Sequence, residues 1–471
     1  MSEPTPSDQP PISSASAAKW CTVASILLII ALSWPFILAQ NTSGRGAFDD
    51  LIYHWPTVQT FADELPTPNL SNYLSATTPG YHLELAIVHR LGASRTLVQL
   101  YASLWTVLLL ATLAWRFGKS FGKQGLLVML PLFASIYILF PAIWLLPDNA
   151  AWLGVLLMLI LAIEKPPTLR VILASGLLLT ILVFIRQIHI WAAALIWTSA
   201  WVGTQSQLPN NTTLPSLFSD PASRLKRLTP ALIAALPAAL ILFWLYTLWG
   251  GLVPPNFQNN HQGANPATPA FILTQIAILS AFYAPILLPQ LLTVIRTHIS
   301  WIITIAVLGL IIGILPHTSM STQDGRFSGW WSIAHKLPTI ANRSPFIILG
   351  ALAGAIACLL WVSMLNRRDA WIFSIGLIAF IAAQSANFAS WQRYHEPFLL
   401  ILGSLIFTRV PAIYNAPKKA IIGSVALALL MGAITVSALK NAEQVQIPTS
   451  SATIIPTTES TIHQHSEPIT P

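Results

Sequence analysis

Two consecutive aspartates, followed by a histidine one helical turn later, are the residues of this sequence best suited to acid–base chemistry. Asp49 and Asp50 directly follow the first long apolar segment. Asp50 and His54 are four residues apart, so on an α-helix they would share one face. A carboxylate beside an imidazole at a membrane surface can act as a general base, as sugar transfer to a hydroxyl requires. The alternative is an acid in a solvated loop that caps a helix. The hypothesis is therefore that Asp50 and His54 are catalytic and that Asp49 contacts substrate.

Further candidates for substrate contact lie at the ends of other apolar segments. Asp148 opens one of them, where it either accepts backbone N–H groups as a helix N-cap or supplies a second acid. Arg186 follows another and could hold a phosphate through its planar guanidinium. Its alternative role is to reach back to the membrane interface. The same two interpretations apply to Arg326 and Arg393.

Five more polar residues complete the candidate set: Gln187, His189, His261, Asp324 and Glu396. His261 lies in a loop rich in Asn and Gln and has no partner at metal-ligand spacing, so substrate contact is the favoured role. Glu396 lies near the end of an apolar segment, where an ionisable group needs a partner. No Gly-rich phosphate loop, Cys-x-x-Cys pair or zinc-protease motif occurs, and the sequence predicts no metal site.

Composition determines the class of protein that must position these residues. Hydrophobic residues make up 54% of the chain, charged residues make up 8%, and the mean hydropathy is +0.65. Soluble domains carry about 25% charged residues, so this chain is predicted to be an integral membrane protein. The formal charge of +8 lacks the dense basic patch that nucleic-acid binding needs. Cys21 and Cys358 lie in apolar segments and are expected to be free thiols.

The hydropathy pattern predicts an all-α polytopic protein with about thirteen transmembrane helices. They lie near 20–39, 95–116, 125–145, 150–164, 169–186, 188–204, 229–250, 269–293, 300–316, 345–365, 370–386, 395–409 and 419–439. Residues 1–19 are expected to be a disordered cytoplasmic N-terminus and residues 20–440 the membrane domain. Residues 441–471, rich in Ser and Thr, are expected to be a disordered extracytoplasmic tail.

Loop charges give this topology an orientation. With a cytoplasmic N-terminus, every loop assigned to the cytoplasm carries at least one Arg or Lys, which is the positive-inside pattern. The loop at 40–94 is then a long first extracytoplasmic loop. All candidate site residues fall on the extracytoplasmic face, although the sequence does not show that they converge.

The order of motifs resembles a known family. The segment 50–56 (Asp-Leu-Ile-Tyr-His-Trp-Pro), followed by Gln59 and by 77–81 (Thr-Thr-Pro-Gly-Tyr), resembles the first luminal loop of the dolichyl-phosphate-glucose-dependent α-1,2-glucosyltransferases. Later segments are similar to that family and follow in the same order along the chain: Phe184-Ile185-Arg186-Gln187, Asn260-His261-Gln262, Asp324-Gly325-Arg326-Phe327 and Arg393-Tyr394-His395-Glu396-Pro397. The first of them has one residue inserted relative to the family's Phe-Arg-Gln, and the last has the family's Glu-Pro-Arg-Tyr in altered order. Two positions depart from the family pattern: Leu51 replaces a Glu and Phe327 replaces a His.

The resemblance, which covers most of 45–410, implies a GT-C bundle with a catalytic acid in its first outer loop. It implies transfer of a hexose, such as glucose, with inversion from a polyprenyl-phosphate-linked donor to a glycan or lipid-linked acceptor. Asp50 would be the base, and Arg186 and Arg326 would contact donor phosphate or acceptor sugar. The donor is a substrate, and no further cofactor is expected. The expected site of action is a bacterial plasma membrane, or the endoplasmic reticulum membrane in a eukaryote.

Two other classes of function remain open at this point. A polytopic transporter or lipid flippase is the main alternative, although transporter sites usually lie near the bilayer midplane and these acids gather at one face. A non-catalytic membrane scaffold is the third. The partners expected are the lipid bilayer and the two glycosyl substrates, with no nucleic acid.

Overall fold

The computed structural model describes residues 15–205, 220–261 and 263–445, and these residues form helices and loops without a β-strand. Among them, six helices are long and apolar enough to cross a membrane by length and composition, or seven if one bent pair is a single span. The chain is therefore an all-α protein of the multi-pass membrane type, as predicted. The finer prediction of about thirteen crossings is not confirmed. Gln262, part of one family-like segment, lies outside the described residues.

The six long helices are α1 (Ala15–Leu38), α5 (Arg95–Phe121, extended to Val128), α12 (Pro221–Trp249), α15 (Ala284–Ile314), α17 (Pro345–Ser363) and α21 (Pro417–Lys440). The bent pair is α8 (Ile136–Ile143) and α9 (Asp148–Glu164), with a bend of 118° between them. The other helices longer than eight residues are α3 (Trp55–Glu64), α4 (Gly80–Arg90), α10 (Leu169–Ile185), α11 (Ala193–Val202), α14 (Thr268–Ala281), α18 (Arg367–Ser385) and α19 (Glu396–Arg409). The short ones are α2 (Arg45–Asp49), α6 (Gly125–Val128), α7 (Leu130–Ala134), α13 (Gln258–His261), α16 (Trp330–Lys336) and α20 (Pro411–Tyr414).

Local chemistry explains where many helices begin. The side chains of Ser94, Thr168 and Asn366 accept hydrogen bonds from the first turns of α5, α10 and α18. This is the usual way to satisfy the free N–H groups of a helix start. Helices α14, α15, α17, α19 and α21 instead carry Pro in the first turn, where the missing N–H is not needed.

Several predicted spans differ from the helices that form, among them the span at 188–204, which begins as a 3-10 helix (Gln187–Ala192) before α11. The span at 125–145 is divided into α6, α7 and α8, because Ser135 takes an extended conformation between two of them. The span at 269–293 breaks between α14 and α15, where Pro285 in the first turn of α15 cannot continue a preceding helix. Helix α15 then runs through the predicted loop before 300–316, with its non-helical kink at His298.

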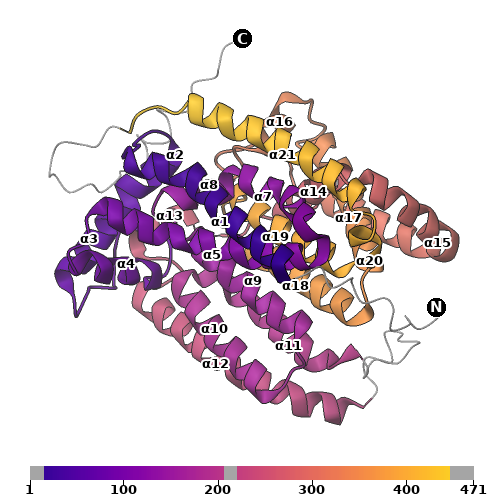
Figure 1. Cartoon of the computed structure of the whole chain (residues 1–471), viewed down its shortest axis with the longest axis horizontal. Coiled ribbons are helices and arrows are strands. Elements are labelled where there is room, and N and C mark those ends of the chain that lie inside the picture. The colour runs from indigo at the N-terminus through magenta and orange to yellow at the C-terminus, as the bar shows by residue number, and fades with distance from the viewer. Residues whose placement is uncertain (1–14, 206–219, 262, 446–471) are drawn as a thin grey trace.

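Figure 1 shows the helices as an elongated bundle, with α3 and α4 together at one end and α15 at the opposite end. Helix α1 packs along α5, α10 packs along α12, and α17 packs against both α14 and α15. Helix α9 lies in the interior, and nearly all of its residues are buried. This arrangement brings the loops after α1, α8, α10 and α18 toward one region, where the candidate residues meet.

The structure also differs from the prediction at the boundaries of both terminal segments. Helix α1 begins at Ala15, inside the segment 1–19 that was expected to be disordered; residues 1–14 lie outside the described residues. At the other end, residues 446–471 lie outside them too, but the first residues of the expected tail are ordered. Gly44 donates to the carbonyl of Glu443 (2.9 Å), and Val445 donates to that of Thr42 (3.0 Å). These backbone hydrogen bonds tie the end of α21 to the segment that leads into α2.

Candidate functional site

Arg393 links two aspartates that lie far apart in the chain. Its Nη1 lies 2.6 Å from Oδ2 of Asp49, and its Nη2 lies 3.8 Å from Oδ2 of Asp148. Asp148 in turn accepts a 2.5 Å hydrogen bond through Oδ1 from Nη1 of Arg186. The structure thus brings four of the predicted site residues together. We refer to Asp49, Asp148, Arg186 and Arg393 as the acid–arginine cluster.

The ends of four elements position this cluster. Asp49 is the last residue of α2, and Asp148 is the first residue of α9. Arg186 follows α10 in an extended conformation, and Arg393 lies in the short 3-10 helix Gln392–Tyr394. Asp148 does not act as an N-cap, because its side chain turns to Arg186 and not to the backbone of α9. Its negative charge still lies at the positive end of the α9 dipole.

Aromatic rings line one side of the cluster. Trp391 and Tyr394 stack with their ring centroids 5.2 Å apart. The Arg393 guanidinium lies over both rings, and that of Arg186 lies 5.3 Å from the centre of Tyr394. His261 meets Trp391 edge to face at 6.4 Å. Burial, followed by the charges of Arg393 and Arg186, lowers the pKa of His261 to about 4, so this imidazole is neutral at pH 7. Rings and fixed guanidinium groups of this kind suit a ligand that has both sugar and phosphate parts.

Asp50 lies apart from the cluster, contrary to its predicted role as the base. Its side chain is 0% exposed, and its Oδ2 accepts hydrogen bonds from Arg95 (2.7 Å) and Gln99 (3.0 Å) on α5. Burial raises its pKa to about 6, although the charge of Arg95 opposes the shift. A fully buried carboxyl held by two side chains cannot reach an acceptor hydroxyl in this conformation. The aspartate that belongs to the acid–arginine cluster is Asp49.

Asp50 and His54 lie at the two ends of a π-helix and contact different partners. Residues Asp50–His54 form a π-helix, in which the N–H of Trp55 bonds to the carbonyl of Asp50 five residues earlier. The segment is thus not the regular α-helix that the prediction assumed. Asp50 contacts Arg95, whereas His54 contacts His82.

His54 and His82 form a buried pair. Nδ1 of His54 lies 2.8 Å from Nε2 of His82, and the two rings are nearly parallel. His82 is 0% exposed and His54 is 7% exposed, so the accessible edge of the pair belongs to His54. Burial lowers the pKa of His54 to about 4 and lowers that of His82 well below its usual range, so both rings are neutral at pH 7. The remaining ring nitrogen of neutral His54, Nε2, can either donate one hydrogen bond to a ligand or accept one from it.

The Gln187 side chain does not bond to the cluster; it bonds to the backbone of neighbouring segments. Its amide accepts from the N–H of Thr78 and donates to the carbonyls of Ala76 and Leu252. The Thr78 hydroxyl also donates to the carbonyl of Val183 on α10. A Cβ on Gly80 would lie 2.5 Å from the carbonyl oxygen of Phe184, so this close approach needs glycine. The segment 77–81 and the segment around Arg186, both family-like in sequence, are thus packed against each other.

His189 and Glu396 are buried behind the cluster. The His189 ring packs edge to face on Trp152 at 4.8 Å, and neither nitrogen has a hydrogen-bond partner among the described residues. Glu396 accepts from the Ser135 hydroxyl (2.6 Å) and from the Gln392 amide (2.5 Å). These neutral donors are the partners that its position required. Both residues are therefore buried in the packing around the cluster, and neither takes part in its ion pairs.

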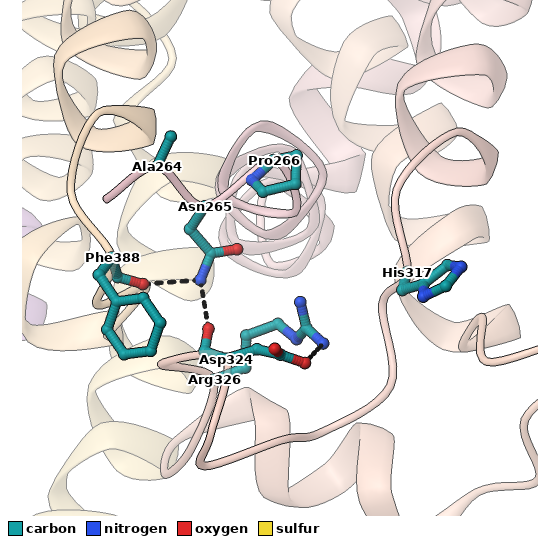
Figure 2. Close-up of a pocket in the computed structure, with 7 residues that line it drawn as sticks. All are labelled: Ala264, Asn265, Pro266, His317, Asp324, Arg326 and Phe388. Carbon is teal, nitrogen blue, oxygen red and sulfur yellow. Dashed lines mark hydrogen bonds and ion pairs between the residues drawn. The ribbon is translucent and has the colours of Figure 1, made fainter. Parts of the chain in front are cut away.

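Asp324 and Arg326 form a second group beside a cavity of about 250 Å³. Figure 2 shows Arg326 paired with Asp324, and Asn265 bonded to the carbonyls of Asp324 and Phe388. His317 also lines this cavity. The group connects to the cluster through Phe327, whose ring meets Trp391 edge to face at 4.9 Å. Arg326 therefore neighbours the cluster but does not join it.

The sequence interpretation missed Arg45 and Arg95. Arg45 stacks its guanidinium over Phe327 and Trp391, at 5.3 and 5.5 Å from the ring centres. It precedes Asp49 by four residues, and this helical spacing was the one signal that could have indicated it. Arg95 opens α5 and pairs with Asp50, a contact over a sequence separation that no local pattern reveals. Within the described residues, no three His, Cys, Asp or Glu side chains gather as a metal-binding group.

Comparison with known proteins gives no relative: no protein-family model, no curated protein and no solved structure matches this chain. Any function must therefore be argued from the cluster itself.

Proposed function

We propose that this chain is a membrane glycosyltransferase of the GT-C type, related to the α-1,2-glucosyltransferases that its motifs resemble. It transfers a hexose from a polyprenyl-phosphate donor to a glycan or lipid-linked acceptor at the extracytoplasmic membrane face. About thirteen membrane crossings, some of them by short or broken helices, belong to this proposal. The observation that carries it is Arg393 bridging Asp49 and Asp148 beside stacked aromatic rings.

The proposed reaction assigns the base to Asp49 in place of Asp50. Oδ2 of Asp49 is held by Arg393, while Oδ1 makes no hydrogen bond within the described part of the chain. This oxygen takes the proton of the acceptor hydroxyl as the acceptor oxygen attacks the anomeric carbon. The bond from that carbon to the donor phosphate breaks, and its electron pair leaves with the polyprenyl phosphate. The configuration inverts, and nearby guanidinium groups stabilise the added negative charge.

The test is sugar transfer by the purified protein in lipid nanodiscs. Donors are farnesyl phosphates that carry different radiolabelled hexoses, and acceptors are lipid extracts of the source membrane. Release of farnesyl phosphate is also measured, because it detects transfer to water when the acceptor is missing. Transfer or release that is lost in Asp49→Asn and kept in Asp63→Asn, an exposed acid of the same loop, supports the proposal. Wild-type protein that neither transfers nor releases any of these sugars contradicts it.

A transporter or flippase without glycosyl transfer is the second candidate. Six long apolar helices within the described residues suit it as well as they suit an enzyme. The topology predicted from the sequence assigns the cluster residues to the extracytoplasmic face, however, whereas transporter sites usually lie near the midplane. Counterflow of a labelled sugar lipid in proteoliposomes, by protein inactive in the transfer assay, would favour this candidate.

A further inference from the structure

Arg45 is an arginine of the site region that the proposed reaction does not yet use. It is the first residue of α2, one helical turn before Asp49. Helix α2 is held firmly, because Gly46 packs directly on the buried ring of Trp144 and a Cβ there would clash with it. The preceding residue, Gly44, is bonded to Glu443. The position of Arg45 relative to Asp49 is therefore determined by the packing of α2.

Aromatic faces hold the Arg45 guanidinium. It lies over the rings of Phe327 and Trp391, at 5.3 and 5.5 Å from their centres. Trp391 stacks on Tyr394, Arg393 lies over both of these rings, and Arg186 lies over Tyr394. Stacking occupies the flat face of a guanidinium and leaves the N–H groups at its edge available. Arg45 is thus oriented without using its donors on a protein carboxylate.

Arg45 differs from the other two arginines at the aromatic pair in its lack of a carboxylate partner. Arg393 pairs with Asp49 and Arg186 pairs with Asp148. Arg45 is exposed, and among the described residues no carboxylate lies within 4 Å of it. The nearby acid Glu396 is buried and held by the neutral groups of Ser135 and Gln392. Of these three arginines, Arg45 is therefore the one whose charge no carboxylate within 4 Å balances among the described residues.

We infer that Arg45 binds the phosphate of the donor lipid. This inference rests on the proposed function. A sugar linked to a polyprenyl phosphate is a phosphodiester with one negative charge, which matches the single uncompensated guanidinium. When the sugar leaves, the phosphate becomes a monoester and gains charge, so a fixed guanidinium favours the departing group. The planar fork of Arg suits two phosphate oxygens at once. Because Arg45 precedes Asp49 by four residues on α2, a phosphate bound to Arg45 would lie on the same side of this helix as the proposed base.

The experiment measures binding, so it does not depend on turnover. Farnesyl phosphate, which represents the leaving group, is titrated into the purified full-length protein in nanodiscs of neutral lipid, with farnesol as the uncharged comparison. Arg45→Gln is expected to weaken farnesyl phosphate binding by about 10- to 100-fold, as loss of charged hydrogen bonds does. Arg45→Lys keeps the positive charge but lacks the planar guanidinium. Its affinity for farnesyl phosphate is expected to lie between those of the wild type and Arg45→Gln. Farnesol binding is expected to be unchanged in both variants.

The matched control is Arg170→Gln, an exposed arginine in the first turn of α10 that faces the predicted cytoplasmic side. It should bind farnesyl phosphate like the wild type. Thermal unfolding of each variant shows whether the fold is retained, and Arg45→Lys serves as the test if Arg45→Gln unfolds. Nanodiscs with phosphatidylglycerol distinguish a donor site from a general lipid-headgroup site. Competition by that lipid as strong as by farnesyl phosphate would overturn the inference.

Two negative results separate this inference from the proposed function. If wild-type protein binds farnesyl phosphate and transfers sugar, but Arg45→Gln binds it equally well, then Arg45 is not the phosphate ligand and the proposed function stands. If wild-type protein neither binds farnesyl phosphate nor transfers sugar, then the proposed function fails and the inference fails with it.

Discussion

Arg393 donates to the carboxylate of Asp49 across 344 residues of sequence, at 2.6 Å. This contact joins the first loop of the chain to the segment before α19. It places an ionisable acid, a second aspartate and stacked aromatic rings within reach of one ligand. Changes to these residues and to the segments that hold them should therefore alter activity and stability in distinguishable ways.

The two consecutive aspartates should separate into an acid that acts on substrate and an acid that supports the fold. Asp49→Asn is expected to lower the transfer rate by about 100- to 10,000-fold, the usual contribution of a general base. Asp50→Asn is expected to keep the rate within about threefold, because Asp50 contacts Arg95 and Gln99 and not the cluster. Initial rates at saturating donor, on protein with confirmed folding, make the comparison. Equal loss in both variants would return Asp50 to a catalytic role.

Removal of Arg393 should destabilise the protein. Arg393→Met leaves Asp49 without its ion-pair partner and Asp148 with Arg186 alone. Breaking a buried pair by removing one partner costs about 3–5 kcal/mol, and part of that is expected here because Arg393 is partly exposed. The double variant Arg393→Met with Asp49→Asn should recover some of the loss, since the unpaired charge is gone. Thermal unfolding in detergent measures both, and a double variant no more stable than Arg393→Met would contradict an ion-pair role.

Asp50 predicts a specific dependence of stability on pH. Its pKa is about 6 in the folded protein and lies near the ordinary 3.8 when unfolded. The folded state therefore holds the Asp50 proton more strongly than the unfolded state does. The stabilisation of the folded protein that results is fully present below about pH 4 and is lost as pH rises through about 6. This difference in pKa corresponds to about 3 kcal/mol. The unfolding temperature of wild type relative to Asp50→Asn should fall between about pH 4 and pH 7. A difference in unfolding temperature between wild type and Asp50→Asn that stays constant over this pH range would contradict a raised pKa for Asp50.

His82 should set the tautomer of His54. Nδ1 of His82 is buried without a partner among the described residues, and an unpaired buried acceptor costs less than an unpaired N–H. His82 thus carries its proton on Nε2 and donates to Nδ1 of His54, which leaves the His54 proton on Nε2. His82→Gln can still donate from an amide, whereas His82→Phe cannot. We expect His82→Phe to lower the transfer rate about tenfold more than His82→Gln does. Nitrogen NMR of labelled histidine reads the tautomer directly, and a protonated Nδ1 on His54 would contradict this prediction.

Gly80 should be intolerant of a side chain. A Cβ there would meet the backbone of Phe184 at 2.5 Å, and backbone cannot move aside easily. Gly80→Ala is expected to cost about 1–3 kcal/mol of stability, as overpacking does. Gly403→Ala on α19 is the matched control, since no atom lies within 4 Å of its added Cβ. The control should be neutral or slightly stabilising. The measurement is the unfolding temperature of each variant. Equal values for Gly80→Ala and Gly403→Ala would argue against the close packing of 77–81 on α10.

The sequence was sufficient for the class of protein and for the region that contains the site. Spans of apolar residues are local features, and loop charges indicate which ends of the helices lie on the same side of the membrane. That reasoning predicted one face for Asp148, Arg186 and Arg393, and the structure brings these three together with Asp49. The number of crossings was less accessible, because breaks such as that at Ser135 depend on packing rather than on hydropathy.

Only the tertiary structure decided which of the two aspartates pairs with Arg393. Consecutive residues on a helix point about 100° apart, so Asp49 and Asp50 cannot both face the same partners. No local pattern indicates which direction is the buried one. That choice depends on Arg95 and Gln99 of α5, which hold Asp50, and on Arg393, which holds Asp49. The sequence determined that a membrane-embedded chain carries acids and arginines near the ends of its apolar segments. The packing of distant helices determined which of them form a site, because long-range contacts are not encoded in neighbouring residues.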